Sequence, residues 1–483
     1  MDLLKRLEAV EINLKQCKNV IDFRIDANTY KKDFLTTEKL LRKLDSKSIE
    51  SLSTSVQNFG AYSLCNFINF QDEGIPFLMT ENIRHNYIEW NIQKYVDQES
   101  HEMLYKSHCK KGQVLITMAG EYLGRAAVYD KDFICSSNQA IAKISLHENE
   151  NPYILSTFLN SKHGQNQINR FRTITGQPNI NMSLIKNLLI PNFGTPFAIK
   201  IEEIIKKSEI SKDNSKKLYL EAENVLYHET GASSSILEQK TSVNANIKSF
   251  KESFSVTGRL DAEYYQRKYE IIIEKIRSKN HDILENIVEI TKSIEPGSQY
   301  YSDDEFGLPY MRVADYNKYG LSKPNKRLTV DFVRDNLQSI NDLKPQKDSI
   351  LFSKDGSVGT AFQLRENFEG ITSSAILNLK VKNHKKVIPE YLTLALNSKL
   401  VQLQAERDAG GSIILHWRIG EIQKVIVPLI NYSKQEKIAK LIEESFFLKN
   451  KSEQLLEIAK NAVEIAIEQN EKAALAYIHN QNI

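Results

Sequence analysis

Residues 437–463 read KIAKLIEESFFLKNKSEQLLEIAKNAV, and residues 200–226 read KIEEIIKKSEISKDNSKKLYLEAENVL. Steps of three and four residues along the first stretch meet apolar or small side chains throughout. The same steps along the second stretch do so in the same frame. A spacing of 3.5 residues is the period of a coiled coil. The two stretches therefore predict two long helices, each with a narrow apolar seam.

The larger side chains of these seams divide evenly between the two helices. They are Ile201, Ile204, Leu218 and Val225 in the first helix and Ile438, Leu441, Leu448 and Leu455 in the second. Serines and alanines lie between them, and such small side chains let two helices approach closely. The alternative is that each helix packs on its own domain as an ordinary amphipathic helix.

The similarity extends outward from the helices over the whole chain. The matched pairs are GIPFLMTENI (74–83) with GLPYMRVADY (307–316), KGQVLITMAG (111–120) with KDSILFSKDG (347–356), and NPYILSTFLNS (151–161) with IPEYLTLALNS (388–398). Their order is kept, and the offset drifts only from 233 (307 − 74) to 237 (388 − 151). Solenoid repeats are far shorter. One unit of roughly 235 residues therefore occurs twice.

The part of each unit before the helix has the pattern of a mixed α/β domain. QVLITM and SILFSK are short strand-like runs, and LLIPNF and VIVPLI are apolar runs closed by proline, which is typical of a strand end. PYILSTFLNS and PEYLTLALNS indicate helices with proline in the first turn. The predicted fold class is therefore α/β, with two duplicated domains that are each followed by a long helix.

Domain boundaries follow from the repeat and from composition. They are a first domain with its N-terminal segment at 1–196, a first long helix at 197–230, a connector at 231–257, a second domain at 258–430 and a second long helix at 431–483. The connector begins with a stretch rich in Gly, Ser, Asn and Thr. Each domain opens on an Arg-aliphatic-Asp-Ala phrase, at 24–27 and 259–262, in which Asp26 and Asp261 are predicted helix N-caps.

Bulk composition is that of a folded protein without a membrane segment. The chain has 483 residues, is 41% hydrophobic and 26% charged, and carries a formal net charge of +3. No apolar run approaches the roughly 18 residues of a membrane span, and the first residues do not resemble a signal peptide. The four cysteines are widely spaced and form no CxxC pair, which fits a reducing compartment. The expected location is the cytoplasm, with no membrane partner.

Motifs for catalysis or cofactor binding do not occur in the sequence. There is no GxxxxGK[ST], no HExxH, no GxSxG and no Cys/His spacing typical of zinc. A duplicated enzyme would be expected to share acids, bases or nucleophiles between its two copies. The repeat shares strands, helix starts and a helical seam instead. This pattern favours a binding or scaffolding protein.

The chain resembles the specificity subunit of type I restriction–modification systems. The stretches that carry the resemblance are RLDAEYY (259–265), ILFSKDG (350–356), ERDAGGS (406–412) and IQKVIVP (422–428). The resemblance implies two target recognition domains, each reading half of a split DNA sequence. It implies that the long helices pack antiparallel as a spacer and dock methyltransferase subunits. It also implies no catalytic residues in this chain.

The partners and cofactors that the resemblance implies lie outside the chain. They are double-stranded DNA and two methyltransferase subunits, with restriction (nuclease or translocase) subunits left open. S-adenosylmethionine is expected in the partner methyltransferase, and no cofactor or metal is expected in this chain. Two alternatives stay open, a pseudo-symmetric scaffold that binds no DNA and an enzyme with an unrecognised site.

Base-reading residues are expected where the two units match in frame but differ in chemistry. One such place is the loop before the last strand, 170–181 against 407–418; with Gly176 set against Gly411, the second loop is two residues longer. Amide side chains suit adenine, and cations and rings offer other contacts. The candidates are Gln177, Asn179, Asn181, His416, Trp417 and Arg418, with Lys354 and Arg312 at two further positions. Ordinary drift between duplicates is the alternative.

Overall fold

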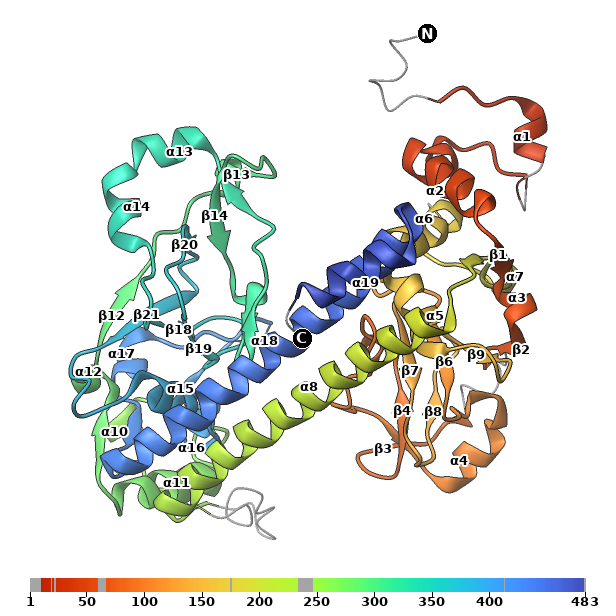
Figure 1. The fold of residues 1–483 in the computed structure, drawn as a ribbon. Helices are drawn as coiled ribbons and strands as arrows, with labels where there is room; N and C mark the ends of the chain where they lie inside the picture. Colours follow the sequence, from red (N-terminus) through yellow and green to blue (C-terminus); the bar gives the residue numbers. More distant parts are fainter. Residues whose placement is uncertain are drawn as a thin grey trace. The chain divides into compact units, whose positions relative to one another are not determined.

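The structure is a computed structural model that describes residues 10–18, 20, 23–59, 67–173, 176–232, 246–411 and 413–481. The chain divides into two compact units (Figure 1). Unit 1 is Met1–Lys212 with Lys449–Ile483, and unit 2 is Asp213–Leu448. The long helices α8 (Thr195–Thr230) and α18 (Tyr432–Glu468) each contribute one part to each unit.

The described residues of unit 1 form three sheets. Its strands are β1 Ser46–Ser48, β2 Ser53–Gln57, β3 Phe70–Gln71, β4 Ile75–Leu78, β5 Tyr95–Val96, β6 Gln113–Thr117, β7 Ala126–Tyr129, β8 Ser136–Ser137, β9 Ile141–Leu146 and β10 Leu189–Pro191. The strand orders are β2-β9-β6-β7, β3-β5-β4-β8 and β1-β10. Its helices, besides parts of α8 and α18, are α1 Leu14–Lys18, α2 Lys32–Lys43, α3 Ile49–Leu52, α4 Gln98–Met103, α5 Pro152–Asn160, α6 Lys162–Phe171, α7 Met182–Lys186 and α19 Glu471–His479, with the short 3-10 helices η1 Ala27–Tyr30, η3 Thr80–Asn82 and η4 Tyr105–Ser107.

Unit 2 repeats these sheets. Its strands are β11 His281–Ile283, β12 Val288–Lys292, β13 Tyr301–Ser302, β14 Leu308–Met311, β15 Tyr316–Asn317, β16 Gly320–Leu321, β17 Arg327–Leu328, β18 Ile350–Ser353, β19 Ala361–Gln363, β20 Ile371–Thr372, β21 Ile376–Val381 and β22 Ile426–Pro428. Its other elements are α10 Phe254–Thr257, α11 Arg267–Arg277, α12 Leu284–Ile287, α13 Val330–Asp335, α14 Leu337–Leu343, α15 Pro389–Asn397, α16 Lys399–Asp408 and α17 Ile419–Gln423, with η5 Ser298–Tyr300 and η6 Val313–Asp315.

The strand orders of unit 2 reproduce those of unit 1 strand for strand. They are β12-β21-β18-β19, β13-β17-β14-β20 and β11-β22, with the two-stranded sheet β15-β16 in addition. The equivalent pairs β4–β8 and β14–β20 are both parallel. The equivalent pairs β6–β7 and β18–β19 are both antiparallel. The predicted α/β fold with a duplicated domain is thereby confirmed.

Several local predictions are confirmed with their physical reasons. β10 and β22 end at Pro191 and Pro428. The helices α5 and α15 start at prolines, whose missing N–H would have no helical partner in the first turn. The side chain of Asn151 caps α5 by accepting from the Tyr153 amide at 2.9 Å.

The two N-cap predictions have different outcomes. Asp26 caps η1, since its carboxylate accepts from the Thr29 amide at 3.0 Å. The prediction for Asp261 is wrong, because residues 262–265 form a turn and not a helix. Both oxygens of Asp261 accept hydrogen bonds from the Arg259 guanidinium instead.

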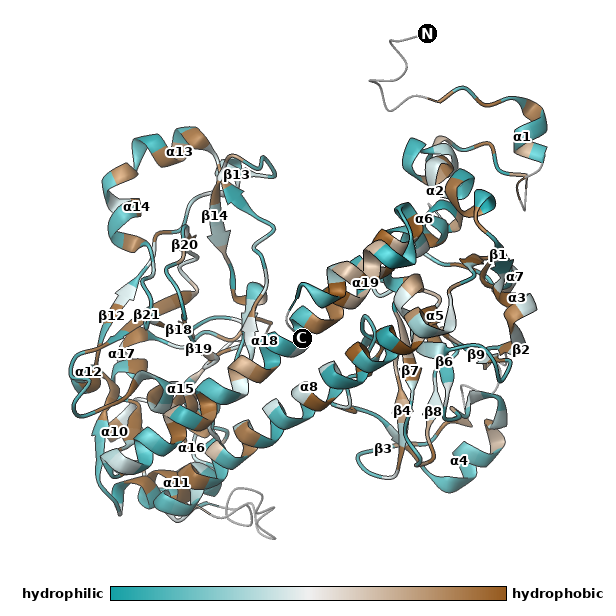
Figure 2. Ribbon diagram, in the orientation of Figure 1, coloured by the Kyte–Doolittle hydropathy of each residue, from teal (hydrophilic) through white to brown (hydrophobic). Residues whose placement is uncertain are grey.

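Each unit has its core between one four-stranded sheet and the helix pair that covers it. In unit 1 these are β2-β9-β6-β7 with α5 and α6, and in unit 2 they are β12-β21-β18-β19 with α15 and α16. In Figure 2, α8 and α18 alternate between hydrophilic and hydrophobic residues along their length. β6 and β18 are buried at every position. Such strands, covered on both faces, explain the continuous apolar runs of the sequence.

The long helices contact each other inside each unit. In unit 1 the hydroxyls of Ser208 and Ser452 lie 2.8 Å apart. In unit 2 those of Ser215 and Ser445 lie 3.2 Å apart. Because the α8 residue number rises while the α18 number falls, the contact is antiparallel. Small side chains at the crossing points explain why serine occupies seam positions.

The predicted seam residues lie at or near this contact. Ile201, Ile204, Ile438 and Leu455 are buried, and Leu218, Val225, Leu441 and Leu448 are half-buried. Ile201 and Ile204 share one core with Leu455 of α18 and with Leu155 of α5. The helices therefore pack both on each other and on the domains, so the two packing modes weighed from the sequence occur together.

Parts of the predicted boundaries fall where the structure gives other limits or none. Residues 233–245 of the connector lie outside the described residues. At the C-terminal side, α18 ends at Glu468 and α19 follows as a separate helix capped by Asn470. Among the described helices, none combines the length and apolarity that a membrane crossing requires.

Candidate nucleic-acid interface

In unit 2 the loop between α16 and α17, residues 409–418, lies along the connection between β18 and β19. The Gly356 amide donates to the Leu415 carbonyl at 2.9 Å, and the Trp417 amide donates to the Lys354 carbonyl at 2.8 Å. These backbone hydrogen bonds determine which loop residues stand beside the connection. They bring together four of the predicted site residues, Lys354, His416, Trp417 and Arg418.

In unit 1 the loop between α6 and α7, residues 172–181, makes the same contact. The Gly120 amide donates to the Pro178 carbonyl and the Ile180 amide donates to the Met118 carbonyl, both at 2.9 Å. The predicted residues of this loop are Gln177, Asn179 and Asn181. Two chemically different loops are thus held by one pattern of backbone hydrogen bonds.

The two loops have the same length. In unit 1 the Thr173 amide donates to the Asn179 carbonyl at 2.9 Å. In unit 2 the Gly410 amide donates to the His416 carbonyl at 3.0 Å. Each hydrogen bond joins two residues that lie six positions apart. Gly410 and His416 each lie 237 positions after Thr173 and Asn179, respectively.

The prediction of a longer second loop is therefore wrong. Gly176 stands opposite Ile413, and not opposite Gly411. Both glycines have positive φ, +73° and +136°, but at different places in the loop. Register is set by the backbone hydrogen bonds on either side, so a glycine that serves a local turn is a poor anchor for alignment.

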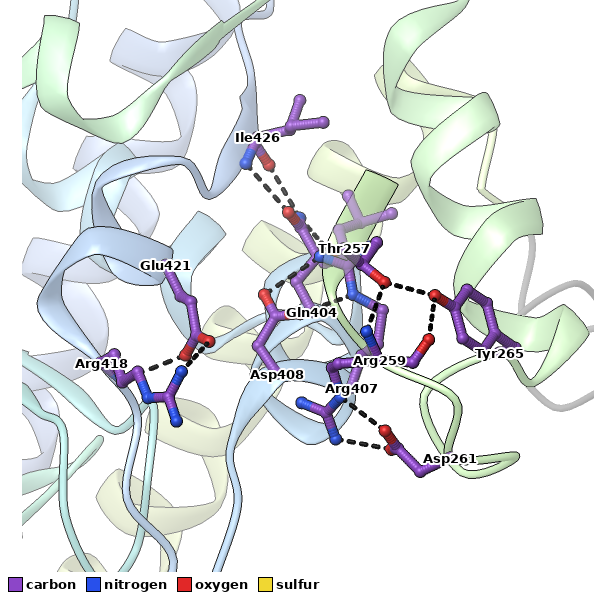
Figure 3. Close-up of polar contacts among 11 residues, drawn as sticks. Thr257, Arg259, Asp261, Tyr265, Gln404, Arg407, Asp408, Arg418, Glu421 and Ile426 are labelled. Carbon is purple, nitrogen blue, oxygen red and sulfur yellow. Dashed lines mark hydrogen bonds and ion pairs between the residues drawn. The ribbon is translucent and has the colours of Figure 1, made fainter. Parts of the chain in front are cut away.

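A repeated polar network fixes the base of each loop. In unit 2, Asn397 exchanges two hydrogen bonds with the backbone of Ala361, and the Gln402 amide donates to the Gly359 carbonyl at 2.7 Å. Gln404 exchanges two hydrogen bonds of 2.9 Å with the backbone of Ile426 (Figure 3). Buried or half-buried amides that find hydrogen-bond partners on neighbouring segments hold those segments together. The connection and the loop are thus positioned before any ligand binds.

Unit 1 has the same network from the same positions. Asn160 clamps Ala126, and Gln165 donates to the Gly124 carbonyl at 2.9 Å. The signal was present in the sequence, because NSKHGQNQ (160–167) and NSKLVQLQ (397–404) share Asn-Ser-Lys and two glutamines. These residues are not among those predicted from the sequence, because they are neither catalytic groups nor different between the two copies.

The Arg-aliphatic-Asp-Ala phrase braces the start of each loop. In unit 1 the Arg24 guanidinium donates to the carbonyls of Phe171 and Arg172 at 3.0 and 3.1 Å, where α6 ends and the loop begins. An arginine at a helix C-terminus satisfies carbonyls that have no helical partner. The Tyr30 hydroxyl donates to the Arg24 carbonyl at 2.5 Å and holds the phrase in place.

In unit 2 the arginine of the Arg-aliphatic-Asp-Ala segment contacts an aromatic ring, and not backbone carbonyls, at the end of the helix. The guanidinium groups of Arg259 and Arg407 lie 4.6 and 5.0 Å from the ring centroid of Tyr264, and Arg407 is in the last turn of α16. Figure 3 shows Arg259 paired with Asp261 beside Tyr265. The hydrogen bond from Arg259 holds the pKa of Asp261 below its usual value. The duplicated phrase therefore has a structural role at the loop base.

Trp417 anchors its loop in the core. Its side chain is 1% exposed, and its ring packs against Phe352 with centroids 5.7 Å apart. The equivalent Ile180 is also buried. In this conformation the ring of Trp417 therefore has no face on which a base could stack.

The charged residues of the second loop differ in availability. The His416 Nδ1 donates to the Asp355 carboxylate at 2.8 Å, while most of its side chain stays exposed. Lys354 forms an ion pair with the same carboxylate and is mostly buried. The Arg418 side chain is exposed, and its Nη1 lies 3.9 Å from Oε1 of Glu421. His416 and Arg418 thus present polar groups to solvent, whereas the Lys354 charge is compensated locally.

The amides of the first loop are also unequal. Gln177 and Asn179 are exposed. The Asn181 side chain accepts from the Leu184 amide at 2.9 Å as the N-cap of α7. Two of the three predicted amides are therefore free to face a ligand, while the third has a capping role.

Arg312 lies on the second sheet of unit 2, directly after β14. Its guanidinium donates to Asn325 at 2.8 Å, and its backbone amide donates to the Asp315 carboxylate at 2.7 Å. Met79 makes the equivalent turn in unit 1, with its amide bonded to Asn82 at 2.8 Å. The structure thus gives the two positions the same turn and different side chains.

Among the described residues, no cluster of three or more His, Cys, Asp or Glu side chains has an arrangement that could bind a metal ion. The candidate interface consists of amides, an imidazole, a guanidinium and backbone. Such groups form hydrogen bonds with base edges and phosphates.

Comparisons with known proteins agree with this chemistry. Residues 284–458 match the family model described as the type I restriction modification DNA specificity domain. The match begins at α12 and extends into α18, so it includes the second loop and its polar network. A comparison with curated protein sequences finds no match.

Solved structures with low similarity include two S subunits. The S subunit of a type I restriction–modification system from M. genitalium is 14% identical, with 89% of this chain and 95% of that chain covered and a TM-score of 0.39. The HsdS subunit from Thermoanaerobacter tengcongensis is 12% identical, with 88% and 96% covered and a TM-score of 0.28. On the strength of the family model, residues 284–458 are a type I restriction–modification DNA specificity domain.

Proposed function

We propose that this chain is a DNA specificity subunit that reads a split target, one half through the loop 172–181 of unit 1 and the other through the loop 409–418 of unit 2. The observation that carries the proposal is the shared backbone scaffold with different side chains. A rigid frame with exchangeable side chains suits recognition of two different base sequences. The family match supports the second unit directly, and the repeat extends the role to the first.

Several contacts between the protein and DNA are expected to fix the position of the protein, and fewer are expected to specify the base sequence. Phosphate contacts orient a protein on DNA, whereas base edges carry sequence identity. Arg418, His416, Gln177 and Asn179 are the exposed side chains that we assign to base edges or adjacent phosphates. The chain has a formal net charge of only +3. We therefore assign much of the phosphate contact to the partner subunits.

We propose that α8 and α18 act as the spacer of this arrangement and dock two methyltransferase subunits. α8 has 36 residues, and at ~1.5 Å per residue it spans about 54 Å. That length corresponds to about 16 base pairs at ~3.4 Å each. Two readers separated on this scale leave base pairs between the half-targets unread. S-adenosylmethionine then belongs to the docked methyltransferase, and the complex acts in the cytoplasm.

Exchange of residues 258–430 for the matching unit of a relative with a different target is expected to change one half of the recognised sequence. The exchanged segment begins at the second Arg-Leu-Asp-Ala phrase and ends after β22, so it leaves both long helices in place. Methylome sequencing of cells that carry the hybrid with the partner methyltransferase checks this. A change in both halves would show that the units are not independent readers.

A further inference from the structure

The tip of the second loop exposes three aliphatic residues in a row. Ile413, Ile414 and Leu415 are 94%, 54% and 45% exposed. In the register set by the backbone hydrogen bonds, Gly176, Gln177 and Pro178 occupy these positions in unit 1. The two loops share their backbone frame and their length. The chemistry at the tip is therefore the largest difference between them.

Backbone contacts of the described loop residues account for this exposure. The amides and carbonyls of Gly410 and His416 exchange two hydrogen bonds, of 3.0 and 2.7 Å, across the loop. Gly411 has φ +136°, and a Cβ at this position would lie 2.0 Å from the Ile414 carbonyl oxygen. Only glycine fits there. The backbone is thus shaped to hold the aliphatic side chains outward.

The surroundings of the tip fit nucleic acid better than an apolar protein surface. His416 and Arg418, exposed cationic or polar residues, follow directly after the aliphatic run. A small apolar centre beside hydrogen-bonding groups matches the edge of a base pair. In the major groove the 5-methyl group of thymine is the apolar feature of that edge, and it is absent from the other three bases.

We infer that Ile413, Ile414 and Leu415 form an apolar reader for the thymine 5-methyl group in the half-target of unit 2. The inference rests on the DNA specificity function and on the reading of one half-target by this loop. Unit 1 reads without such a reader, since Gln177 offers an amide at the matching position.

The test uses the complex of the full chain with its partner methyltransferase and a duplex that carries the target. Each thymine of the second half-target is replaced in turn by uracil, which removes the methyl group and keeps the pairing and the hydrogen-bonding edges. At one position or more, uracil is expected to weaken binding by about 4-fold, the effect of losing one buried carbon atom. Uracil in the first half-target is the matched DNA control, because unit 1 has no apolar reader whose contact with a methyl group could be lost.

The protein variants connect the effect to the loop. The double variant Ile413→Ser with Ile414→Ser is expected to bind thymine and uracil duplexes equally, with unchanged thermal unfolding because both side chains are exposed. Gln177→Ser in unit 1 is the matched control and should keep the full thymine preference in the second half-target.

Three results would overturn the inference. They are a second half-target without thymine on either strand, uracil effects below twofold throughout, and a double variant that keeps the preference. Each leaves the DNA specificity function intact if the complex still prefers its target over a scrambled duplex. Loss of that preference in the unaltered complex would overturn the function, and the inference with it.

Discussion

A fragment of residues 1–235 is expected to form a homodimer that directs methylation to a palindromic target. The fragment keeps the first domain and α8, but it loses α18 and α19 and with them the residues of these helices that share the core of Ile201 and Ile204. The exposed seam should bind the same seam of a second copy about a two-fold axis. Because both copies then carry the first loop, each half-target should be the one read by unit 1.

The serine contacts explain why the homodimer fits. Ser208 contacts Ser452, and Ser215 contacts Ser445. With the repeat offset of 237, Ser452 is the equivalent of Ser215, and Ser445 is the equivalent of Ser208. In a two-fold dimer, Ser208 of one copy would therefore meet Ser215 of the other, twice, with the geometry that the full chain already has.

Light scattering of the fragment at tens of micromolar measures its oligomeric state. Burial of each seam side chain contributes about 1.5–3 kcal/mol before entropy is subtracted, which allows micromolar association. The variant Ile204→Asp with Leu218→Asp should be monomeric. A monomeric unaltered fragment would contradict the pairing of the seams and would remove the support for a helical spacer.

The substitution Ile204→Asp in the full chain is expected to cost about 4 kcal/mol or more of unfolding free energy. Ile204 is 1% exposed between the core of unit 1 and α18, so an aspartate there loses apolar contacts and buries a carboxyl group without a partner. Its control is Ile210→Asp on the same helix, since Ile210 is 61% exposed.

Urea unfolding followed by circular dichroism compares the two variants. Ile210→Asp should stay within about 0.5 kcal/mol of the unaltered chain, as is usual for exposed positions. If both variants lost the same stability, the burial pattern of α8 would be wrong. If neither did, the seam would not be part of the core of unit 1.

The sequence was sufficient to predict the duplication, the α/β class and the long helices, because these depend on local patterns. Apolar runs with terminal proline became β10 and β22, and prolines in the first turn opened α5 and α15. The 3.5-residue seam follows from helical geometry alone. Each of these features is determined by residues close together in the chain.

Features that depend on contacts between distant residues were missed. Trp417 was predicted at the interface, but it packs on Phe352, which lies 65 positions earlier. The loop register was misplaced because it depends on hydrogen bonds to the β18–β19 connection. A single sequence shows which residue types are present and not which partners they find.

The most direct test of two independent readers is methylome sequencing of two single variants beside the unaltered chain. Asn179→Ala removes an exposed amide from the first loop, and His416→Ala removes an exposed imidazole from the second, at equivalent positions. The account predicts a split target for the unaltered chain, with Asn179→Ala relaxing one half only and His416→Ala the other half only. A continuous target, or variants that relax the same half, would contradict it.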